Sequence, residues 1–89
     1  MVNNRPHEQF LPTGAQLAAA RAATGLSVQA LAERTGLGVN TVRRAEAGGA
    51  KVLTAVNAER LVAGLQALGI TFLTPDADGP GLRIATPPT

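Results

Sequence analysis

The chain has no cysteine, tryptophan or tyrosine, and it holds one histidine and two phenylalanines among 89 residues. Without cysteine it can form neither disulfides nor thiolate zinc sites, and this composition suits a reducing cytosol. His7 alone cannot build a metal site, so we expect no metal and no other cofactor. No stretch approaches the roughly 18–20 apolar residues of a membrane span, and the N-terminal MVNNRPHEQF lacks the apolar segment of a signal peptide.

Apolar residues make up 45% of the chain, but many of them are alanine and only two are aromatic. A chain of this length forms one domain and buries only roughly 60–65% of its unfolded surface. The core must therefore come from leucine, valine and alanine on packed helices. Because neither disulfides nor a metal can support so small a domain, a subunit interface is the leading candidate for additional stability.

Positive charge gathers in the middle of the chain. The whole chain has a net charge of +2, whereas residues 14–51 carry five cations and two acids, a net of +3. The cations are Arg21, Arg34, Arg43, Arg44 and Lys51, and the acids are Glu33 and Glu46. A basic surface attracts phosphate and produces binding that weakens as salt is added.

Three short helices separated by glycines are predicted in the first half of the chain. The first is the alanine-rich segment Gly14–Thr24, which follows the N-cap residue Thr13. The second spans Val28–Thr35 after the N-cap Ser27, and the third spans Val39–Ala47. A tight turn that contains glycine joins the second helix to the third, which is the spacing of a helix-turn-helix motif.

The second half of the chain predicts one more helix and then a change to β structure. Asn57 can cap a helix over Ala58–Leu68, whose leucines fall on one face. Ile70–Thr74 and Leu82–Ala85 alternate like strands. The turn-forming segment Pro75–Gly81 between them predicts a β-hairpin with a loop of about seven residues. A hairpin alone is marginal, so it must pack on the helices or pair across a subunit interface.

The stretches LSVQALAERTGL (26–37) and NTVRRAEAG (40–48) resemble the helix-turn-helix of the Cro/C1 (XRE-type) repressor family. The resemblance implies a mainly α fold, with a four-to-five-helix lambda-repressor-like helix-turn-helix domain over residues 13–69. A C-terminal β-hairpin at residues 70–85 follows it. On this division residues 1–12 form a flexible N-terminal arm and residues 86–89 a disordered tail.

The third helix is the candidate reader of DNA bases. A major groove admits one α-helix, which must present its N-terminal half to the base edges. Helical spacing exposes four of its side chains: Val39, Asn40, Arg43 and Arg44. An asparagine amide suits adenine, an arginine fork suits guanine, and valine can touch a thymine methyl. The base-reading positions of the family map onto Val39, Asn40, Thr41 and Arg44, with Arg43 beside them.

Phosphate contacts are expected to frame the third helix. The N-terminus of the second helix, at Ser27, Val28 and Gln29, offers free N–H groups and the positive end of a helix dipole. The family carries glutamine directly after the cap, where this chain has Val28, so the backbone contact is the expected one. Lys51, in the loop after the third helix, is a further expected phosphate ligand.

One acid of the third helix, Glu46, does not suit a surface that faces DNA. In the family a glutamate at this place pairs with an arginine of the first helix, and that arginine matches Arg21. We expect a partly buried pair that holds the first helix against the third. The family often has a large apolar residue where this chain has Ala45, so another side chain must fill the space, and Leu53 and Phe72 are the candidates.

These observations predict a sequence-specific DNA-binding transcriptional regulator of the repressor type, bacterial, cytoplasmic and associated with the nucleoid. We expect a homodimer on duplex operator DNA with a palindromic or repeated sequence, its recognition helices about 34 Å apart. The hairpin can supply the dimer by strand pairing, because its edge would otherwise stay open. The expected contacts are Ile70, Phe72, Leu82 and Ile84. The fourth helix and the loop before it form the alternative dimer surface.

A second function, of a different class, is a protein-interaction module. An antitoxin or an anti-activator could use the same fold to occupy a protein partner. An acidic or neutral third helix would indicate it, and Arg43 and Arg44 argue against it. The sequence has no paired carboxylates, no nucleophile–base set and no phosphate-binding glycine fingerprint, so we do not expect an enzyme.

Overall fold

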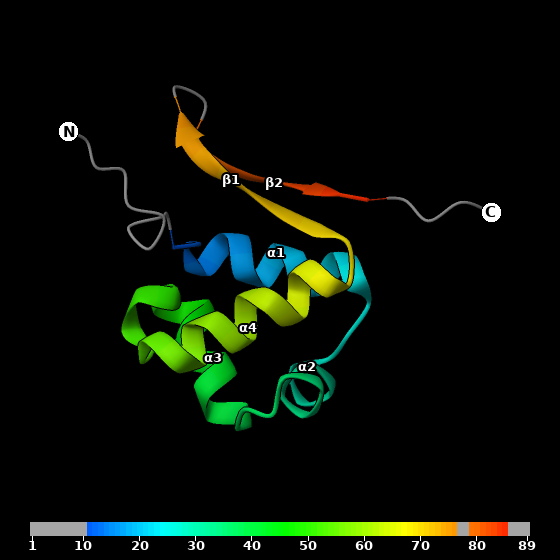
Figure 1. Cartoon of the computed structure of the whole chain (residues 1–89), viewed down its shortest axis with the longest axis vertical. Helices are drawn as coiled ribbons and strands as arrows, with labels where there is room; N and C mark the ends of the chain where they lie inside the picture. Colours follow the sequence, from blue (N-terminus) through cyan, green and yellow to red (C-terminus); the bar gives the residue numbers. More distant parts are fainter. Residues whose placement is uncertain (1–10, 77–78, 86–89) are drawn as a thin grey trace.

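The computed structural model describes residues 11–76 and 79–85, which form four α-helices, one 3₁₀ helix and a two-stranded antiparallel sheet (Figure 1). The helices are α1 (Gly14–Thr24), α2 (Val28–Thr35), α3 (Val39–Gly48), the 3₁₀ helix η2 (Ala50–Val52) and α4 (Ala55–Ala67). The strands are β1 (Ile70–Asp76) and β2 (Gly79–Ile84). The predicted mainly α fold with a C-terminal hairpin is confirmed. The expected arm before residue 11, with His7, and the expected tail at residues 86–89 lie outside the described residues.

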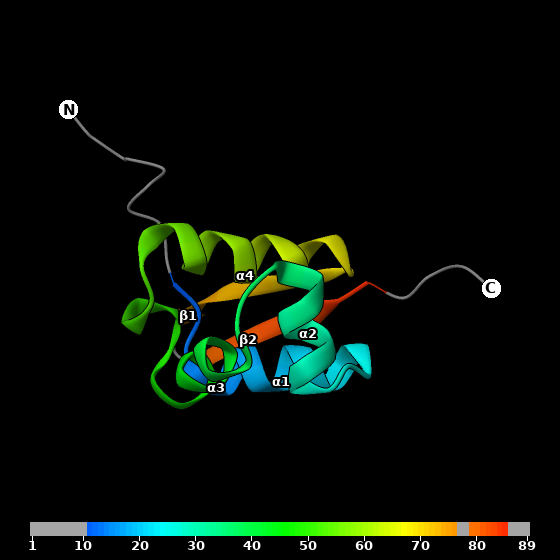
Figure 2. The ribbon, with the colours of Figure 1, turned by 90° about the horizontal axis from the view of Figure 1, so that it is seen from below.

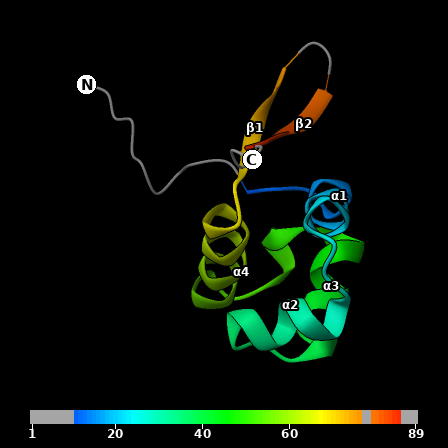
Figure 3. The ribbon, with the colours of Figure 1, turned by 90° about the vertical axis from the view of Figure 1, so that its right-hand side faces the viewer.

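The elements lie in three layers. In Figure 1 the hairpin is at the top, α1 and α4 are in the middle, and α2 and α3 are at the bottom, and Figure 3 shows the same order from the side. Seen from below in Figure 2, α4 runs on the side of β1 and α1 on the side of β2, in keeping with their contacts. The hairpin and the pair α2–α3 therefore face opposite directions.

Local capping explains where α1 begins and where α1 and α2 end. The Thr13 hydroxyl accepts the N–H of Gln16 at 3.1 Å, and the Gln16 Oε1 accepts the N–H of Thr13 at 2.9 Å, which is a capping box. Gly25 and Gly36 follow α1 and α2 with φ of 77° and 74°, a conformation that glycine adopts without strain. The bounds of α1 and α2 are as predicted, and α3 extends one residue further, to Gly48.

The start of α4 differs from the prediction. Thr54 is its N-cap, because the Thr54 hydroxyl accepts the N–H of Asn57 at 3.1 Å. The helix therefore begins at Ala55 and ends at Ala67, and the prediction of Asn57 as the cap is wrong. Threonine and asparagine are both good caps, and here the first of the two candidates along the chain takes the position. The expected loop before this helix also contains η2.

The hairpin is longer than predicted. β1 continues to Asp76 and β2 begins at Gly79, so the expected loop Pro75–Gly81 is wrong. The register pairs Leu73 with Gly81, becomes irregular after Leu73, and resumes with Asp76 opposite Gly79. In a two-stranded sheet both strands are edges, where proline and glycine are tolerated, so turn-forming residue types did not end the strands.

A buried amide fastens the hairpin to α1. The Gln16 residue is 3% exposed, and its Nε2 donates to the carbonyl oxygens of Leu73 at 3.1 Å and Gly81 at 2.5 Å. Its Oε1 serves the capping box with Thr13 at the same time. Both ends of the amide are therefore used, and each strand of the hairpin is tied to the first turn of α1.

We expect the substitution Gln16→Glu to loosen the hairpin. The glutamate keeps an acceptor for the capping box but cannot donate to the two strand carbonyls, so the free energy of unfolding should fall by about 2 kcal/mol. Urea unfolding measures this loss, and amide exchange should be faster in β1 and β2 than in α3. Gln66→Glu, on the exposed side of α4, is the matched control and should unfold like the wild type. Equal stability of the two variants would contradict the role of Gln16.

The core lies between the helices and the inner face of the hairpin. Its largest fully buried side chains are Leu17, Leu31, Val42, Leu61, Leu65 and Ile70. A methyl group built on Gly14 would overlap the carbonyl oxygen of Glu46, so the backbones of α1 and α3 nearly touch beside the buried Ala45. The small residues Gly14 and Ala45 thus allow this close approach. Leu53 and Phe72, the expected fillers, pack half-buried against the same core.

Candidate nucleic-acid interface

The helices α2 and α3 are held together by a small apolar seam. Leu31, Ala32 and Val42 are each at most 2% exposed, and Leu37 packs against them from the turn. The turn is closed by the N–H of Leu37, which donates to the carbonyl oxygen of Ala32 at 2.9 Å. This seam fixes the angle at which α2 and α3 cross, so α3 is held rigidly relative to α2.

The outer face of α3 is polar and cationic. Asn40, Arg43 and Arg44 are exposed, while Val42 and Ala45 on the opposite face are fully buried. In the described part of the chain neither arginine pairs with an acid, and the acidic residue of the same helix is already engaged by Arg21. The side chains of this face are therefore available to a ligand rich in negative charge.

Two of the five predicted base-reading residues are only half exposed. Val39 packs partly against the core, and Thr41 is half-buried in the first turn of α3 beside Gly38. The structure therefore brings Asn40, Arg43 and Arg44 together on one open surface and leaves Val39 and Thr41 at its margin.

Arg21 links three parts of the helical domain. Its Nε donates to Oε2 of Glu46 at 2.7 Å and its Nη2 to Oε1 at 3.1 Å, which makes a two-pronged ion pair between α1 and α3. Its Nη1 also donates to the carbonyl oxygen of Leu26 at 3.1 Å, just before α2. The side chains of Arg21 and Glu46 are 24% and 14% exposed. The hydrogen bonds to Glu46 raise the pKa of Arg21, so the guanidinium stays charged.

The contact with Leu26 was not predicted. The family resemblance gives the ion pair between Arg21 and Glu46 but not the third donor of the guanidinium, since a backbone carbonyl leaves no mark in a sequence. Because Leu26 precedes Ser27, this hydrogen bond positions the N-terminus of α2 relative to α3. One arginine thus sets the geometry between the two predicted DNA-contacting regions.

The N-terminus of α2 has open N–H groups. The Ser27 hydroxyl accepts the N–H of Ala30 at 3.0 Å, and the N–H groups of Val28 and Gln29, in the first turn, have no acceptor within the helix. Ser27 and Gln29 are exposed, and Val28 is half-buried against the core. This end of α2 can therefore offer backbone donors and a positive helix dipole to an anion.

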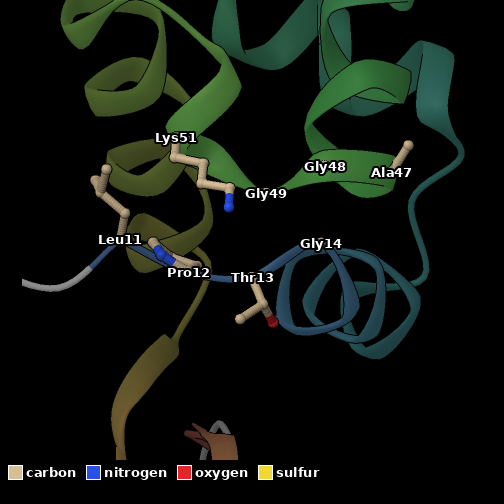
Figure 4. A pocket seen from close by; sticks show the side chains of 8 residues that line it. All are labelled: Leu11, Pro12, Thr13, Gly14, Ala47, Gly48, Gly49 and Lys51. Atoms are coloured by element: carbon tan, nitrogen blue, oxygen red, sulfur yellow. The ribbon is translucent and has the colours of Figure 1, made fainter.

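Lys51 lies on η2, after the C-terminal end of α3. It borders a shallow pocket of about 310 Å³ formed by residues 11–14 and 47–49, and its side chain extends into the pocket beside Gly49 (Figure 4). Pro12 is buried there, and its carbonyl oxygen accepts the N–H of Ala50 at 3.0 Å. The last part of the expected arm is thus fastened to the domain, and Lys51 itself is exposed.

The predicted dimer contacts divide into two groups. Ile70 is 2% exposed and belongs to the core of the single chain, and Phe72 and Leu82 pack half-buried against that core. Ile84 is 51% exposed. Three of the four side chains therefore stabilise the monomer, because the face of the hairpin that carries them lies on the helices.

A capped helix, a glycine turn and a second helix with a cationic outer face define a helix-turn-helix domain of the DNA-binding regulator class. Comparison with family models agrees with this class: the model described as a helix-turn-helix domain matches residues 13–71. The chain belongs to this family, as expected from its resemblance to the Cro/C1-type proteins. A search of curated proteins found no match.

Residues 11–76 and 79–85 contain no cluster of three or more histidine, aspartate or glutamate side chains that could hold a metal ion. In the same part of the chain, none of the helices has the length and apolar character needed to cross a bilayer.

Proposed function

We propose that this chain is a sequence-specific transcription regulator of the repressor type, which inserts α3 into the major groove and acts as a homodimer. The observation that carries the proposal is the outer face of α3, where Asn40, Arg43 and Arg44 are exposed on a helix held by a buried seam. Bidentate side chains on a rigid helix suit the donor and acceptor pattern of base edges. Twofold symmetry of a dimer would match a palindromic operator.

The surroundings of α3 support the same mode of binding. Arg21 neutralises the acid of this helix and holds the start of α2 in place, so Ser27, Val28 and Gln29 can contact phosphates on one side of the groove. Lys51 would reach phosphate from the segment after α3. Val39 and Thr41, at the margin of the open face, would contribute contacts near the leading end of the helix.

Duplex binding at two salt concentrations tests the proposal. The purified chain is titrated with a labelled fragment from upstream of its own gene and with a shuffled duplex of equal length. We expect tighter binding to the upstream fragment, and a fall in affinity of about a thousandfold between roughly 50 mM and 200 mM salt, as for about six neutralised phosphates. Failure to bind either duplex at low salt would contradict the proposal and would favour a protein partner instead.

A further inference from the structure

We propose that Arg43 and Arg44 read guanines on opposite strands of the duplex, so that each half-site of the operator carries one guanine in either strand. The inference rests on the proposed function, because it states what α3 recognises once the helix lies in a major groove. Both arginines are exposed, and in the described part of the chain neither pairs with an acid. Their positions around the helix axis separate their roles.

The open face of α3 has a central line with one arginine on each side. Successive residues of an α-helix are about 100° apart around its axis, so the exposed residues Asn40 and Ala47 fall roughly 20° apart and form this line. From Asn40, Arg43 lies about 60° to one side and Arg44 about 40° to the other. The two arginine side chains therefore leave the helix about 100° apart, with two shorter side chains between them.

Burial shows that this line, and neither arginine, is the centre of the open face. Val39 and Thr41 stand about 100° from Asn40 on either side, and both are half-buried. Val42, on the far side of the helix, is fully buried. The line through Asn40 and Ala47 is therefore the part of α3 that can approach the floor of a groove, and the arginines point towards the two walls.

Each wall of the major groove is the backbone of one strand, and the N7 edge of a purine lies nearest to the backbone of its own strand. A guanidinium has donors only, in a planar fork. Guanine presents two acceptors to the major groove, N7 and O6, whereas adenine presents one acceptor beside an amino donor. Guanine is therefore the base that suits each arginine, while Asn40, which both donates and accepts, suits adenine. Two arginines directed at two walls reach guanines in different strands.

The contacts of Arg21 indicate which arginine faces which strand. Glu46 follows Arg43 by three residues, so both lie on the same side of α3. Arg21 donates two hydrogen bonds to Glu46, at 2.7 and 3.1 Å, and a third to the carbonyl oxygen of Leu26, just before α2. The N-terminus of α2 therefore lies on the Arg43 side of α3. Arg43 should read the strand whose phosphates this N-terminus contacts, and the other arginine the complementary strand.

Selection of binding sites from random duplexes tests the assignment. The full chain is expected to enrich a half-site with one guanine in each strand. Arg43→Ala should lose the preference at one of these guanines and Arg44→Ala at the other, and each variant should bind the wild-type site about tenfold to a hundredfold more weakly. Arg83→Ala, on β2, removes the same charge away from α3 and is the matched control, which should select the wild-type sequence.

Modified duplexes identify the acceptor and the strand. In 7-deazaguanine a carbon replaces N7, so the base still pairs but loses one acceptor. Placed in one strand, it should weaken binding of the wild type and of Arg44→Ala several-fold without affecting Arg43→Ala, and placed in the other strand it should do the reverse. Because the chain has no cysteine, a single Gln29→Cys can carry a DNA-cleaving iron–EDTA group at the exposed start of α2. Cleavage should be strongest in the strand that holds the Arg43 guanine.

The outcomes distinguish this inference from the proposed function. Two guanines in the same strand, an unchanged selected sequence for either arginine variant, or equal effects of 7-deazaguanine on the two variants would overturn the inference and leave a sequence-specific DNA-binding protein. Cleavage from Gln29→Cys mainly in the strand of the Arg44 guanine would overturn the strand assignment. A chain that enriches no sequence would refute the proposed function, and the inference with it.

Discussion

Alanine at both Arg43 and Arg44 is expected to weaken binding to the target duplex by about a thousandfold. Each bidentate arginine–guanine contact is worth about 1–3 kcal/mol, and both side chains are exposed without a partner in the described part of the chain. The free energy of unfolding should change by less than about 0.5 kcal/mol, because exposed substitutions away from structural contacts have small effects. Fluorescence anisotropy measures the affinity, and urea unfolding measures the stability.

The single variants distinguish base reading from simple attraction. Arg44→Lys keeps the charge but loses the planar fork, so it should bind the target and a shuffled duplex with similar affinity. Arg83→Ala removes one equal charge from β2, a strand that lies opposite α2 and α3 (Figure 1), and should leave the preference for the target intact. If Arg44→Ala and Arg83→Ala weakened binding equally, α3 would not be the reading helix.

Alanine at Arg21 is expected to lower the free energy of unfolding by about 2 kcal/mol, since the pair is only partly buried. The change removes the two N–H groups that Arg21 donates to the Glu46 carboxylate and the one that it donates to the carbonyl oxygen of Leu26. The side chain of Glu46 is only 14% exposed, so water replaces these donors poorly. Removing one partner of a buried pair costs more than removing both, because the remaining charge is unpaired. The double variant Arg21→Ala with Glu46→Ala should therefore be more stable than Arg21→Ala alone.

Thermal and urea unfolding of the four members of this cycle give the coupling energy. Arg34→Ala, an exposed arginine of α2, is the matched control and should unfold within about 0.5 kcal/mol of the wild type. The same transition midpoint for Arg21→Ala and the wild type would show that the pair adds nothing to stability. Because the unpaired acid also lies near the DNA-contacting regions, Arg21→Ala should lower DNA affinity even under conditions where it is folded.

The helices were predictable where local chemistry decides their ends. Thr13 and Ser27 cap α1 and α2, and Gly36 ends α2, as their residue types indicate. The start of α4 was missed because Thr54 and Asn57 are both good caps, and the choice between them depends on how the chain leaves η2. Local signals of equal strength do not determine such a boundary.

Contacts between segments that are distant in the chain could not be predicted from the sequence. Nothing near Gln16 indicates that its amide reaches Leu73 and Gly81 on the hairpin, since that contact exists only after the chain has folded. Phe72 was predicted both as a filler of the core and as a dimer contact, and the alternating pattern alone could not decide that it packs half-buried on its own helices. Helical spacing correctly predicted that Asn40, Arg43 and Arg44 of α3 are exposed, but it also predicted an exposed Val39, which is half-buried because it packs against the core.

The contacts of Gly14 and Gln16 have a mechanical consequence. Both residues lie in the first turn of α1. Gly14 contacts the backbone near the end of α3, and the Gln16 side chain donates hydrogen bonds to both strands of the hairpin. If the hairpin supplies the dimer, as its sequence predicts, the hairpin and the recognition helix are connected through a single turn of α1, without a flexible linker. The protein could then adjust little to its target, and the base pairs between the half-sites would have to twist or bend, so their torsional compliance would contribute to selectivity.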